Sequence, residues 1–455
     1  LKGANAIMGR SKKVIGVVAI FLTNLLIGYL LAEVQSPIVV YNASKIITLN
    51  PDTPITEAVA VRGERILAAG SVADIQERFS DQDLIFDSRF ENLVLIPGLI
   101  NQHEHAWLAS LLFSTAILSI EDWVLPDGTV KRAEGAVEYR ERLKNIVKSH
   151  SDSSEVLYTW GFHQLFHGEL TRADLDEIST TIPIVVLQRS LHEQIHNTAA
   201  LNHFGIDQSL IDDASPSARA QTNLSEGHFW EQGQSLIVPV VFADLFRPSR
   251  YLPALEKLEA YWHAAGTTLV AEPGGIVSPA LIAAQNQVLG DLDTPFRMYY
   301  IADGRSFVTN FHESDVITET EKLYISAEGM TKFIPNQVKL FADGAMFSQL
   351  MQMSEGYLDG HHGEWLMDPE VFERAFRIYW DAGFQIHVHQ NGDAGLDMVL
   401  ENLEVSLERN FRSDHRTVIV HFGFSRPDQV ERIAALGAIV SANPFYPIIL
   451  ADRYS

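Results

Sequence analysis

The chain has 455 residues, 46% of them hydrophobic and 20% charged, which describes a globular protein long enough for one large barrel or two to three ordinary domains. Its net charge of −24, without a basic cluster beyond the N-terminus, argues against nucleic-acid binding. The absence of cysteine excludes disulfides, thiolate zinc sites and cysteine nucleophiles, so a transition-metal site would need histidine and carboxylate ligands.

Residues 1–36 are predicted to be a leader and a signal anchor. Arg10, Lys12 and Lys13 precede the apolar run Val14–Leu31, the order of a secretory signal or anchor. The run is near the lower limit for spanning a bilayer, and its basic flank predicts an exported protein body. No A-x-A cleavage site follows, which favours an uncleaved anchor; a buried core helix is the alternative. Because seven residues precede the first methionine and the chain stops abruptly at Ser455, we expect a translation of an incomplete gene.

Residues 37–92 are predicted to form the N-terminal part of a small β domain. The stretches IVVYNASKIITLN and AVAVRGERILAAG have strand composition, and Gly63-Glu64 is typical of a hairpin turn. The only helix expected in this region is a short one at Val72–Phe79.

The stretch Leu93–His105, LVLIPGLINQHEH, is the one around which the rest is interpreted. Its apolar part predicts a strand that is buried on both faces and ends at Asn101. His103 and His105 follow, and in extended backbone residues two apart point to the same side. Two imidazoles at the end of a strand commonly present nitrogen ligands to a divalent metal. Two loop histidines without a metal are the alternative.

Residues 106–254 are predicted to be a subdomain inserted after the first barrel strand, because the segment is far longer than one crossover helix needs. We expect a helix at Glu134–Ser149, a capping box formed by Thr171 and Asp174, and a strand in IPIVVLQRS. The segment Leu191–Leu201 is expected to open a further helix.

Buried strands alternate with amphipathic helices from Leu255 onward, which is typical of parallel βα units. With the strand at Leu93, about seven strands are present, so residues 93–455 are predicted to form an incomplete (β/α)₈ TIM barrel with a small flanking β-sandwich domain. A three-layer open sheet is the alternative. The expected strands are 267–272, 296–302, 338–344, 384–390, 417–423 and 437–444, and the expected helices are 255–265, 319–329, 369–382, 393–409 and 427–436.

Potential metal ligands gather at one end of this barrel, since the carboxyl ends of the strands line the active site. His103 and His105 follow the first strand, Lys339 lies on the fourth, and His421 ends the sixth. An ammonium group in an apolar strand is costly without a partner. Lys339 therefore either pairs with the nearby Asp343, or has a lowered pKa and reacts with CO₂ to form a carbamate that can bridge two metals.

Other polar residues leave alternatives open. His387 and His389 point the same way on the fifth strand, so one can be a ligand and the other its neighbour. His421 by itself would also fit a satisfied core histidine. Asp393 follows a glycine at the start of a helix, where an N-cap role is expected. The histidines in loop-like segments are expected at the surface: His163, His167, His361 and His362.

Five segments share, in order along the chain, the pattern of one enzyme family. PGLINQHEH looks like the signature P-G-x-I-D-x-H-x-H, and VKLFADGAMFS looks like V-K-x-x-x-D-G. LHEQIHNTAALN is similar to G-H-x-x-x-x-N-S-A-A-L, HVHQNGDAGLDMVLENLE to an H-x-x-G-D-x-A helix start, and TVIVHFGFSRPDQVERIAALGAIVSANP to an I-E-H segment with its following strand. From about Val39 to its end the chain thus resembles the amidohydrolase superfamily, and within it the amidohydrolase 3 family of N-substituted formamide deformylase-like proteins.

The resemblance implies a metal site and a substrate contact. It implies that the protein binds one or two zinc ions, and another divalent metal is left open. It also implies that His192 contacts the substrate. The family's aspartate after strand eight, a metal ligand and general acid/base, would lie beyond Ser455, as would the C-terminal return of the β-sandwich. The ligands implied are His103, His105, Lys339 as a carbamate, His389 and His421, with His389 favoured over His387 because it stands three residues before Gly392.

The sequence departs from the family pattern at two places. Asn101 stands where the signature usually has aspartate, which is expected to alter the hydrogen bonds around the first ligands. Gln390-Asn391 stands where the family often has Ala-Ile, which is expected to change the shape of the pocket only.

The resemblance implies a metal-dependent hydrolase that cleaves an amide, formamide or cyclic amide bond of a small molecule, not a peptide bond, with metal-activated water. Without strand eight the chain as given is expected to turn over poorly. The alternatives are a catalytically decayed, membrane-tethered binding or regulatory protein, and a deaminase or esterase of the same superfamily. We expect no nucleic-acid partner. We do expect the N-terminal segment to contact a membrane, and the protein to be exported, either membrane-anchored or periplasmic or extracellular. A homo-oligomer is left open.

Overall fold

The computed structural model describes residues 36–275 and 278–450, and the chain divides into two compact units, Leu1–Gly98 and Leu99–Ser455. The predicted signal anchor at Val14–Leu31 lies outside the described residues. Among the helices of the described ranges, none combines the length and the apolar character needed to cross a bilayer.

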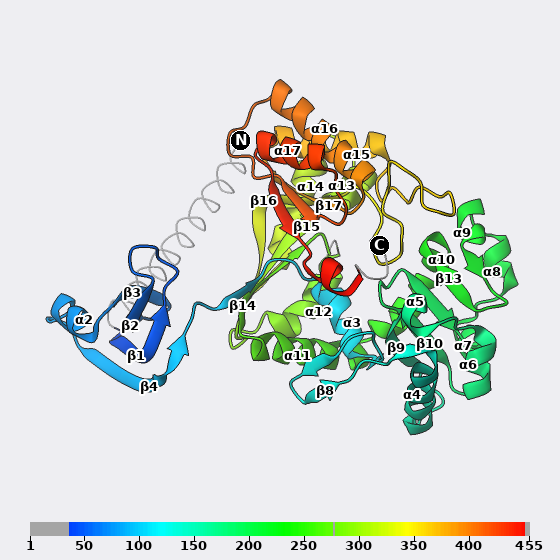
Figure 1. Ribbon diagram of the computed structural model, residues 1–455, viewed down its shortest axis with the longest axis horizontal. Helices are drawn as coiled ribbons and strands as arrows, with labels where there is room; N and C mark the ends of the chain where they lie inside the picture. The colour runs from blue at the N-terminus through cyan, green and yellow to red at the C-terminus, as the bar shows by residue number, and fades with distance from the viewer. Residues whose placement is uncertain (1–35, 276–277, 451–455) are drawn as a thin grey trace, which may run out of the picture. The chain divides into compact units, whose positions relative to one another are not determined.

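The first unit contains a four-stranded sheet in the order β3-β2-β1-β4 (Figure 1). β1 pairs antiparallel with β2 and parallel with β4, and Gly63-Glu64 forms the predicted turn between β2 and β3. The described elements are β1 (Ile38–Ile47), β2 (Ile55–Arg62), β3 (Arg65–Gly70), α2 (Val72–Arg78) and β4 (Leu84–Leu95). Its core is small: Ile38, Val40, Ala58, Ala60 and Ile75.

The prediction of one doubly buried strand at Leu93–Asn101 is wrong. Two strands occupy this stretch, because β4 ends at Leu95 in the small sheet and β5 (Leu99–Asn101) begins the large one. Pro97 lies between them and has no N–H to continue a ladder. Both strands are sheet edges, and several of their apolar side chains are exposed; Ile100, for example, is 66% exposed.

The second unit is built on seven parallel strands in the order β19-β18-β17-β16-β15-β14-β5. The Gln102 side chain, just after β5, donates a hydrogen bond to Ser441 Oγ on β19 over 3.1 Å. The two outermost strands of the order therefore approach each other, which a flat open sheet would not allow. This curled sheet confirms the predicted TIM-barrel-like fold. The remaining strands are β14 (Thr267–Pro273), β15 (Arg297–Asp303), β16 (Thr331–Phe341), β17 (Gln385–Gln390), β18 (Val418–His421) and β19 (Ile439–Ala442).

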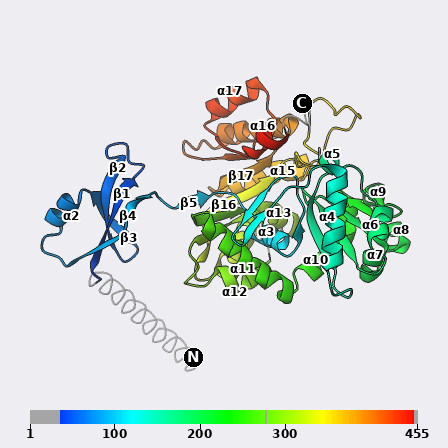
Figure 2. The same cartoon turned by 60° about the horizontal axis from the view of Figure 1, so that its bottom comes forward.

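Helices follow the strands along the outer side of the curled sheet (Figure 2). They are α11 (Pro248–Ala264), α12 (Pro279–Leu289), α13 (Gly304–Asn310), α14 (Val316–Lys322), α15 (Pro369–Asp381), α16 (Asp393–Arg409) and α17 (Pro427–Leu436), with a π-helical turn, η2 (Tyr446–Leu450), near the end. The helix expected at 319–329 is wrong: α14 ends at Lys322 and a 3₁₀ turn, η1 (Leu323–Ser326), continues. Tyr324, Ile325 and Ser326 have low helix propensity, which agrees with this early end.

The inserted region carries a six-stranded sheet in the order β12-β13-β11-β10-β9-β6. Thr171 and Asp174 form the predicted capping box. The helix expected from Leu191 is wrong at its start, since β11 comes first and α7 begins at Thr198. The strands of this sheet are β6 (Ala116–Ile117), β9 (Leu157–Phe162), β10 (Ile184–Gln188), β11 (Glu193–His196), β12 (Thr222–Asn223) and β13 (His228–Trp230). A separate two-stranded sheet is formed by β7 (Trp123–Leu125) and β8 (Gly128–Val130). The helices are α3 (Ala106–Phe113), α4 (Gly135–Ser149), α5 (Gln164–His167), α6 (Arg172–Ile178), α7 (Thr198–Phe204), α8 (Gln208–Asp212), α9 (Pro216–Ala220) and α10 (Glu231–Leu245).

The sheet of the insertion lies between two hydrophobic cores. Val185 and Leu187 on β10 belong to the core shared with the barrel, whereas Ile184 and Val186 belong to a second core. All of these side chains are essentially fully buried. Because successive side chains of a strand point to opposite faces, β10 contributes to both cores and attaches the insertion to the barrel.

Candidate metal centre

Four histidines singled out from the sequence lie together at the carboxyl ends of the parallel strands. The ring centroids of His103 and His105 are 5.1 Å apart, and those of His103 and His421 are 4.8 Å apart. The ring of His389 lies 4.4 Å from that of His421. Histidines from the segment after β5, from β17 and from β18, which are distant in the sequence, therefore meet at one end of the sheet.

The closest approach within this group joins Nε2 of His103 to Nε2 of His105, at 3.3 Å. Two nitrogens bound to one zinc at about 2.0–2.1 Å with tetrahedral geometry would be about 3.4 Å apart. The pair thus has the spacing and the donor chemistry of two ligands to a single ion. Within the described ranges, however, no group of three or more His, Asp or Glu side chains is arranged so that it could hold a metal ion.

Lys339 lies on β16, opposite His387 in the register of β16 and β17, and is 1% exposed. Burial, only partly offset by the charge of Asp303, lowers the pKa of its ammonium group to about 7. Asp303 pairs with Lys339 in the register of β15 and β16, so it, and not Asp343, is the neighbouring acid. No ion pair of Lys339 is found among the described residues, and its Nζ lies 5.7 Å from the ring centroid of Phe341.

The histidines of this cluster are held in the neutral form that metal ligation requires. Burial, followed by the charge of Lys339, lowers the pKa of His105 to about 3 and lowers the pKa of His103 and His389 well below the ordinary value. Burial, followed by the nearby His389, does the same to the pKa of His421.

The backbone turns sharply where His421 ends β18. His421 has φ +72° and Phe422 has φ +50°, in the left-handed region that residues other than glycine rarely adopt. The Phe422 N–H donates to Gln390 O, and the Asn443 N–H donates to His421 O, so neighbouring strands hold this turn. Strained backbone of this kind is held only where its surroundings fix it, and it is frequent at functional sites.

His387 and His389 have different surroundings, although they share one face of β17. A ring nitrogen of His387, Nε2, lies 3.1 Å from Gln337 Oε1, whereas His389 contacts His421. Nε2 of His389 also lies 3.0 Å from Nδ2 of Asn391. The departure at Asn391 therefore reaches a predicted ligand, and the expectation that it changes pocket shape only is wrong.

A model of the amidohydrolase family matches residues 91–454. The chain belongs to the amidohydrolase family. It is 24% identical over 410 residues to the exoenzymes regulatory protein AepA of Pectobacterium carotovorum subsp. carotovorum, covering 87% of this chain and 82% of that protein. It is 22% identical over 410 residues to the N-substituted formamide deformylase of Arthrobacter pascens, covering 87% and 71%. An uncharacterized metal-dependent hydrolase from Pyrococcus horikoshii OT3 shares the fold with a TM-score of 0.64 at 18% identity, over 92% of this chain and 76% of that one.

In this amidohydrolase His192 lies in the inserted region, just before β11. Its Nδ1 lies 2.9 Å and 3.1 Å from the two carboxylate oxygens of Glu231. Burial opposes the charged form of His192, but the hydrogen bond and charge of Glu231 raise its pKa above the ordinary value. The charge of His192 also helps to lower the pKa of His389, so the two side chains are within electrostatic reach of each other.

Asp343 and Asp393 hold the loop between β16 and α15. The carboxylate of Asp343 accepts hydrogen bonds from the N–H groups of Gln352, Asn391 and Gly392, at 2.6–2.9 Å. Burial raises the pKa of Asp343 to about 7 in spite of these bonds. The N-cap role expected for Asp393 is wrong, since Gly392 is the N-cap of α16.

Asp393 instead joins three segments of the amidohydrolase. It accepts hydrogen bonds from the Ser354 N–H, from the Ser354 hydroxyl and, over 2.7 Å, from Arg426 Nη1. The expectation of surface positions for His163 and His167 is also wrong, because each is 1% exposed. Nε2 of His167 lies 3.2 Å from Ala133 O, so a structural hydrogen bond explains its burial.

Arg189 is a further residue near the site that the sequence did not single out. It follows β10, donates to Glu121 over 2.9 Å, and places its guanidinium 5.1 Å and 5.4 Å from the ring centroids of Phe347 and Phe445. Its neighbours come from three distant parts of the chain, which no local pattern could have indicated. The insertion is thereby fastened to the loops around the histidines.

Glu272 was missed as well. It is the second-last residue of β14, is 1% exposed, and its Oε1 lies 3.9 Å from Nδ1 of His105. Burial raises its pKa well above the ordinary value. The available signal was an acidic residue at the end of the apolar strand TTLVAE, in the position where neighbouring strands carry ligands.

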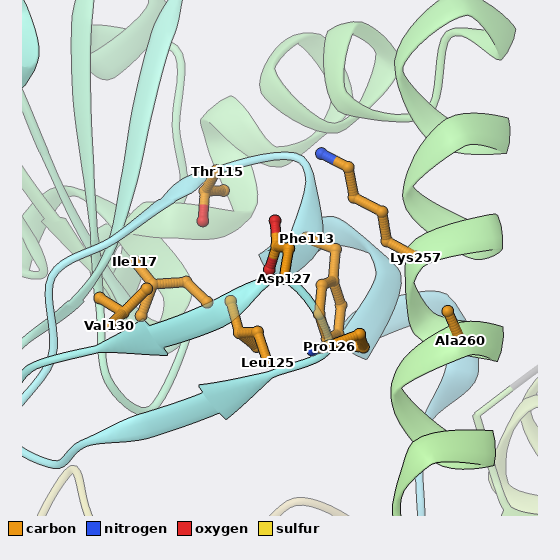
Figure 3. A pocket seen from close by; sticks show the side chains of 9 residues that line it. All are labelled: Phe113, Thr115, Ile117, Leu125, Pro126, Asp127, Val130, Lys257 and Ala260. Carbon is orange, nitrogen blue, oxygen red and sulfur yellow. The ribbon is translucent and has the colours of Figure 1, made fainter.

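A separate cavity of about 300 Å³ lies between α3, the β7–β8 hairpin and α11 (Figure 3). Its lining is mostly apolar, with Asp127 and Lys257 as its charged residues. It includes none of the predicted metal ligands, so this cavity is distinct from the candidate metal centre.

Proposed function

We propose that this amidohydrolase cleaves an amide, formamide or cyclic amide bond of a small molecule, and not a peptide bond, with a divalent metal held by the histidine cluster and Lys339. The observation that carries the proposal is the meeting of His103, His105, His389 and His421 at the carboxyl ends of parallel strands. In barrels of this kind these strand ends form the active site. The name of the formamide deformylase relative supports the same reaction class.

The donor set favours zinc as the first candidate, since neutral imidazoles and oxygen ligands suit it and cysteine is absent. When bound, a zinc ion supplies Lewis acidity that polarises a carbonyl and lowers the pKa of a coordinated water to about 7. The protein contributes neutral imidazole lone pairs and a partly buried setting. His192, with its positive charge supported by Glu231, is proposed to donate a hydrogen bond to the substrate.

Lys339 is proposed to be carboxylated. The lone pair of its Nζ attacks CO₂, one C=O bond becomes a C–O⁻ group, and the nitrogen releases a proton. The product is an anion with two oxygens in place of a buried ammonium group. This exchange suits a side chain that is 1% exposed and has no ion pair among the described residues, because an unpaired buried charge is costly without a compensating ion.

The test compares the purified protein with Lys339→Ala. Zinc content per chain and the hydrolysis of N-formyl amines, cyclic amides and a matching ester are measured. We expect bound zinc in the wild type, and in Lys339→Ala a loss of zinc and of hydrolysis by about 100-fold or more. Lys332→Ala is the matched control, because Lys332 lies on the same strand and is exposed. Unchanged zinc content and rate in Lys339→Ala would dismiss the carbamate.

A binding or regulatory protein without catalysis is the second candidate. The relative from Pectobacterium is named a regulatory protein, and no group of three or more metal-binding side chains in the described ranges stands ready to hold an ion. The same measurements separate the two. A wild type that binds no zinc and hydrolyses no member of the panel would favour the regulatory candidate.

A further inference from the structure

Glu272 lies on the buried side of the His103–His105 pair. Its Oε2 accepts a hydrogen bond from the Ala106 N–H over 3.1 Å, which fixes the carboxyl group at the start of α3. Its other oxygen, Oε1, is buried and has no hydrogen-bond partner among the described residues. A buried polar atom without a partner is uncommon and calls for an explanation.

Nδ1 of His105 is in the same condition. It is buried without a hydrogen-bond partner in the described parts of the chain, and it lies 3.9 Å from Oε1 of Glu272. The other ring nitrogen, Nε2, faces His103. The two nitrogens of this ring therefore face different groups, with the carboxyl on one side and the candidate metal position on the other.

Gly275 leaves room for the Glu272 carboxyl. A Cβ at this position would lie 1.9 Å from Oε1 of Glu272 and 2.7 Å from Nε1 of Trp107. Any residue other than glycine would displace the carboxyl group from its place beside His105. The chain thus keeps this space free at a point where the backbone passes close to the site.

The charges also fit. Glu272 is 1% exposed, and His105 is the only basic side chain within ion-pair distance among the described residues. Buried carboxylates are normally compensated by a cation or a metal. A divalent ion bound to Nε2 of His105 would provide this compensation through the imidazole ring.

We propose that Glu272 is a positioning residue for metal binding. Its Oε1 accepts a hydrogen bond from Nδ1–H of His105, which fixes the ring and its tautomer and leaves the lone pair of Nε2 for the metal. An approach of about 1 Å closes the present distance to that of a charge-assisted hydrogen bond. The inference rests on the proposed function and adds a residue that sets the affinity of the site.

The first test measures zinc affinity of the full chain by competition with a chromophoric chelator. Glu272→Gln removes the charge with little change in shape, and Gly275→Ala displaces the carboxyl without removing it. We expect both to bind zinc about tenfold more weakly or worse, as is typical when a partner of a ligating histidine is lost. Thermal unfolding of each variant without metal checks that it is folded.

Glu104→Gln is the matched control. Glu104 is a neighbouring carboxyl that accepts a hydrogen bond from the backbone N–H of His105 and does not contact the ring. We expect it to change zinc affinity much less than Glu272→Gln. An equal loss in the two variants would mean that negative charge alone matters, and would overturn the positioning role.

The second readout is the tautomer of His105 in metal-free protein, from ¹⁵N chemical shifts of labelled histidine assigned with His105→Asn. At a pH high enough to ionise Glu272, we expect the Nδ1–H form in the wild type and a shift toward the Nε2–H form in Glu272→Gln. Unaltered zinc affinity in Glu272→Gln and Gly275→Ala, with zinc still bound by the wild type, would overturn this inference alone. A wild type that binds no zinc would overturn the proposed function and this inference together.

Discussion

His196 shows how burial sets the charge of a single histidine away from the metal centre. Its side chain is fully buried at the end of β11, and its Nε2 lies 3.1 Å from Gln194 Oε1. Burial lowers its pKa to about 3, so it is neutral in the folded protein at any pH near neutrality. In the unfolded chain the same group titrates near its ordinary value of about 6.5.

This difference predicts a loss of stability in mild acid. Between pH 6.5 and about 3 the unfolded chain binds a proton at His196 that the folded chain does not, so the free energy of unfolding falls as the pH falls. The contribution is at most about 1.4 kcal/mol per pH unit. Urea unfolding at pH 7, 6 and 5 should show a shallower dependence in His196→Gln than in the wild type. His312→Gln, at an exposed position, is the control, and identical slopes for the wild type and His196→Gln would contradict the prediction.

Single residues of the candidate site were predictable where chemistry and spacing coincide. The H-x-H spacing, a lysine within an apolar strand and a histidine at a strand end pointed to His103, His105, Lys339 and His421. Glu272 was not singled out, because its approach to His105 depends on how distant parts of the chain come together. Asn391 was noticed as a departure from the family pattern, but its contact with His389 was not foreseen. The sequence also placed Lys339 beside Asp343, whereas strand register puts it beside Asp303.

At the scale of elements, Asp343 links the end of β16 to the turn before α16. It satisfies three backbone N–H groups in the loop and the turn that flank the histidines. Gly395 on α16 makes room for it, since a Cβ there would lie 2.6 Å from Asp343 Cγ. One carboxylate therefore fixes both the loop after β16 and the turn before α16, two segments that are neither helix nor strand.

Asp343→Ala is expected to lower the free energy of unfolding by about 3 kcal/mol or more, because each buried N–H left without a partner costs about 1–3 kcal/mol. Urea unfolding at neutral pH measures the change. Asp359→Ala, in the same loop, is the comparison, since the Asp359 side chain is 73% exposed. A loss no larger in Asp343→Ala than in Asp359→Ala would show that the loop does not depend on this carboxylate.

The helices that could be located from the sequence have recognisable residues at their ends and an apolar side that repeats with the helical period. α16 and α17 have the predicted bounds, and Pro427 at the first position of α17 with Gly437 after its end marks both limits. The stretch at Leu93–Asn101 was misread because an apolar run looks the same whether it lies at the centre of a sheet or at an edge. Whether the run lies at the centre or at the edge depends on which strands pair with it, and the residues of the run do not indicate that.

At the scale of the whole molecule, the two compact units have separate cores. The small β domain packs around Ile38, Val40 and Ile75, and none of its core residues belongs to the cores of the larger unit. All seven tryptophans lie after Gly98, in the larger unit. Tryptophan fluorescence therefore reports on the barrel and its insertion, while calorimetry reports on both units.

We expect two thermal transitions by calorimetry and one by tryptophan fluorescence. If the proposed function holds, zinc at about 100 times its dissociation constant stabilises the larger unit by about 2.7 kcal/mol and leaves the other transition in place. Scans with and without zinc measure this. Equal displacement of both calorimetric transitions by zinc would contradict the assignment of the metal to the barrel unit.

The two-sided burial of β10 also restricts how a substrate can enter. Val185 and Leu187 pack in one hydrophobic core, whereas Ile184 and Val186 pack in the other. Swinging the insertion away as a rigid cover would expose a continuous hydrophobic face to water, at a cost of about 25 cal/mol for each Å². If the proposed function holds, we expect a substrate to enter and leave past loops and not by a rigid opening of the insertion, and changes of substrate range to arise in loops while the strands behind them stay in place.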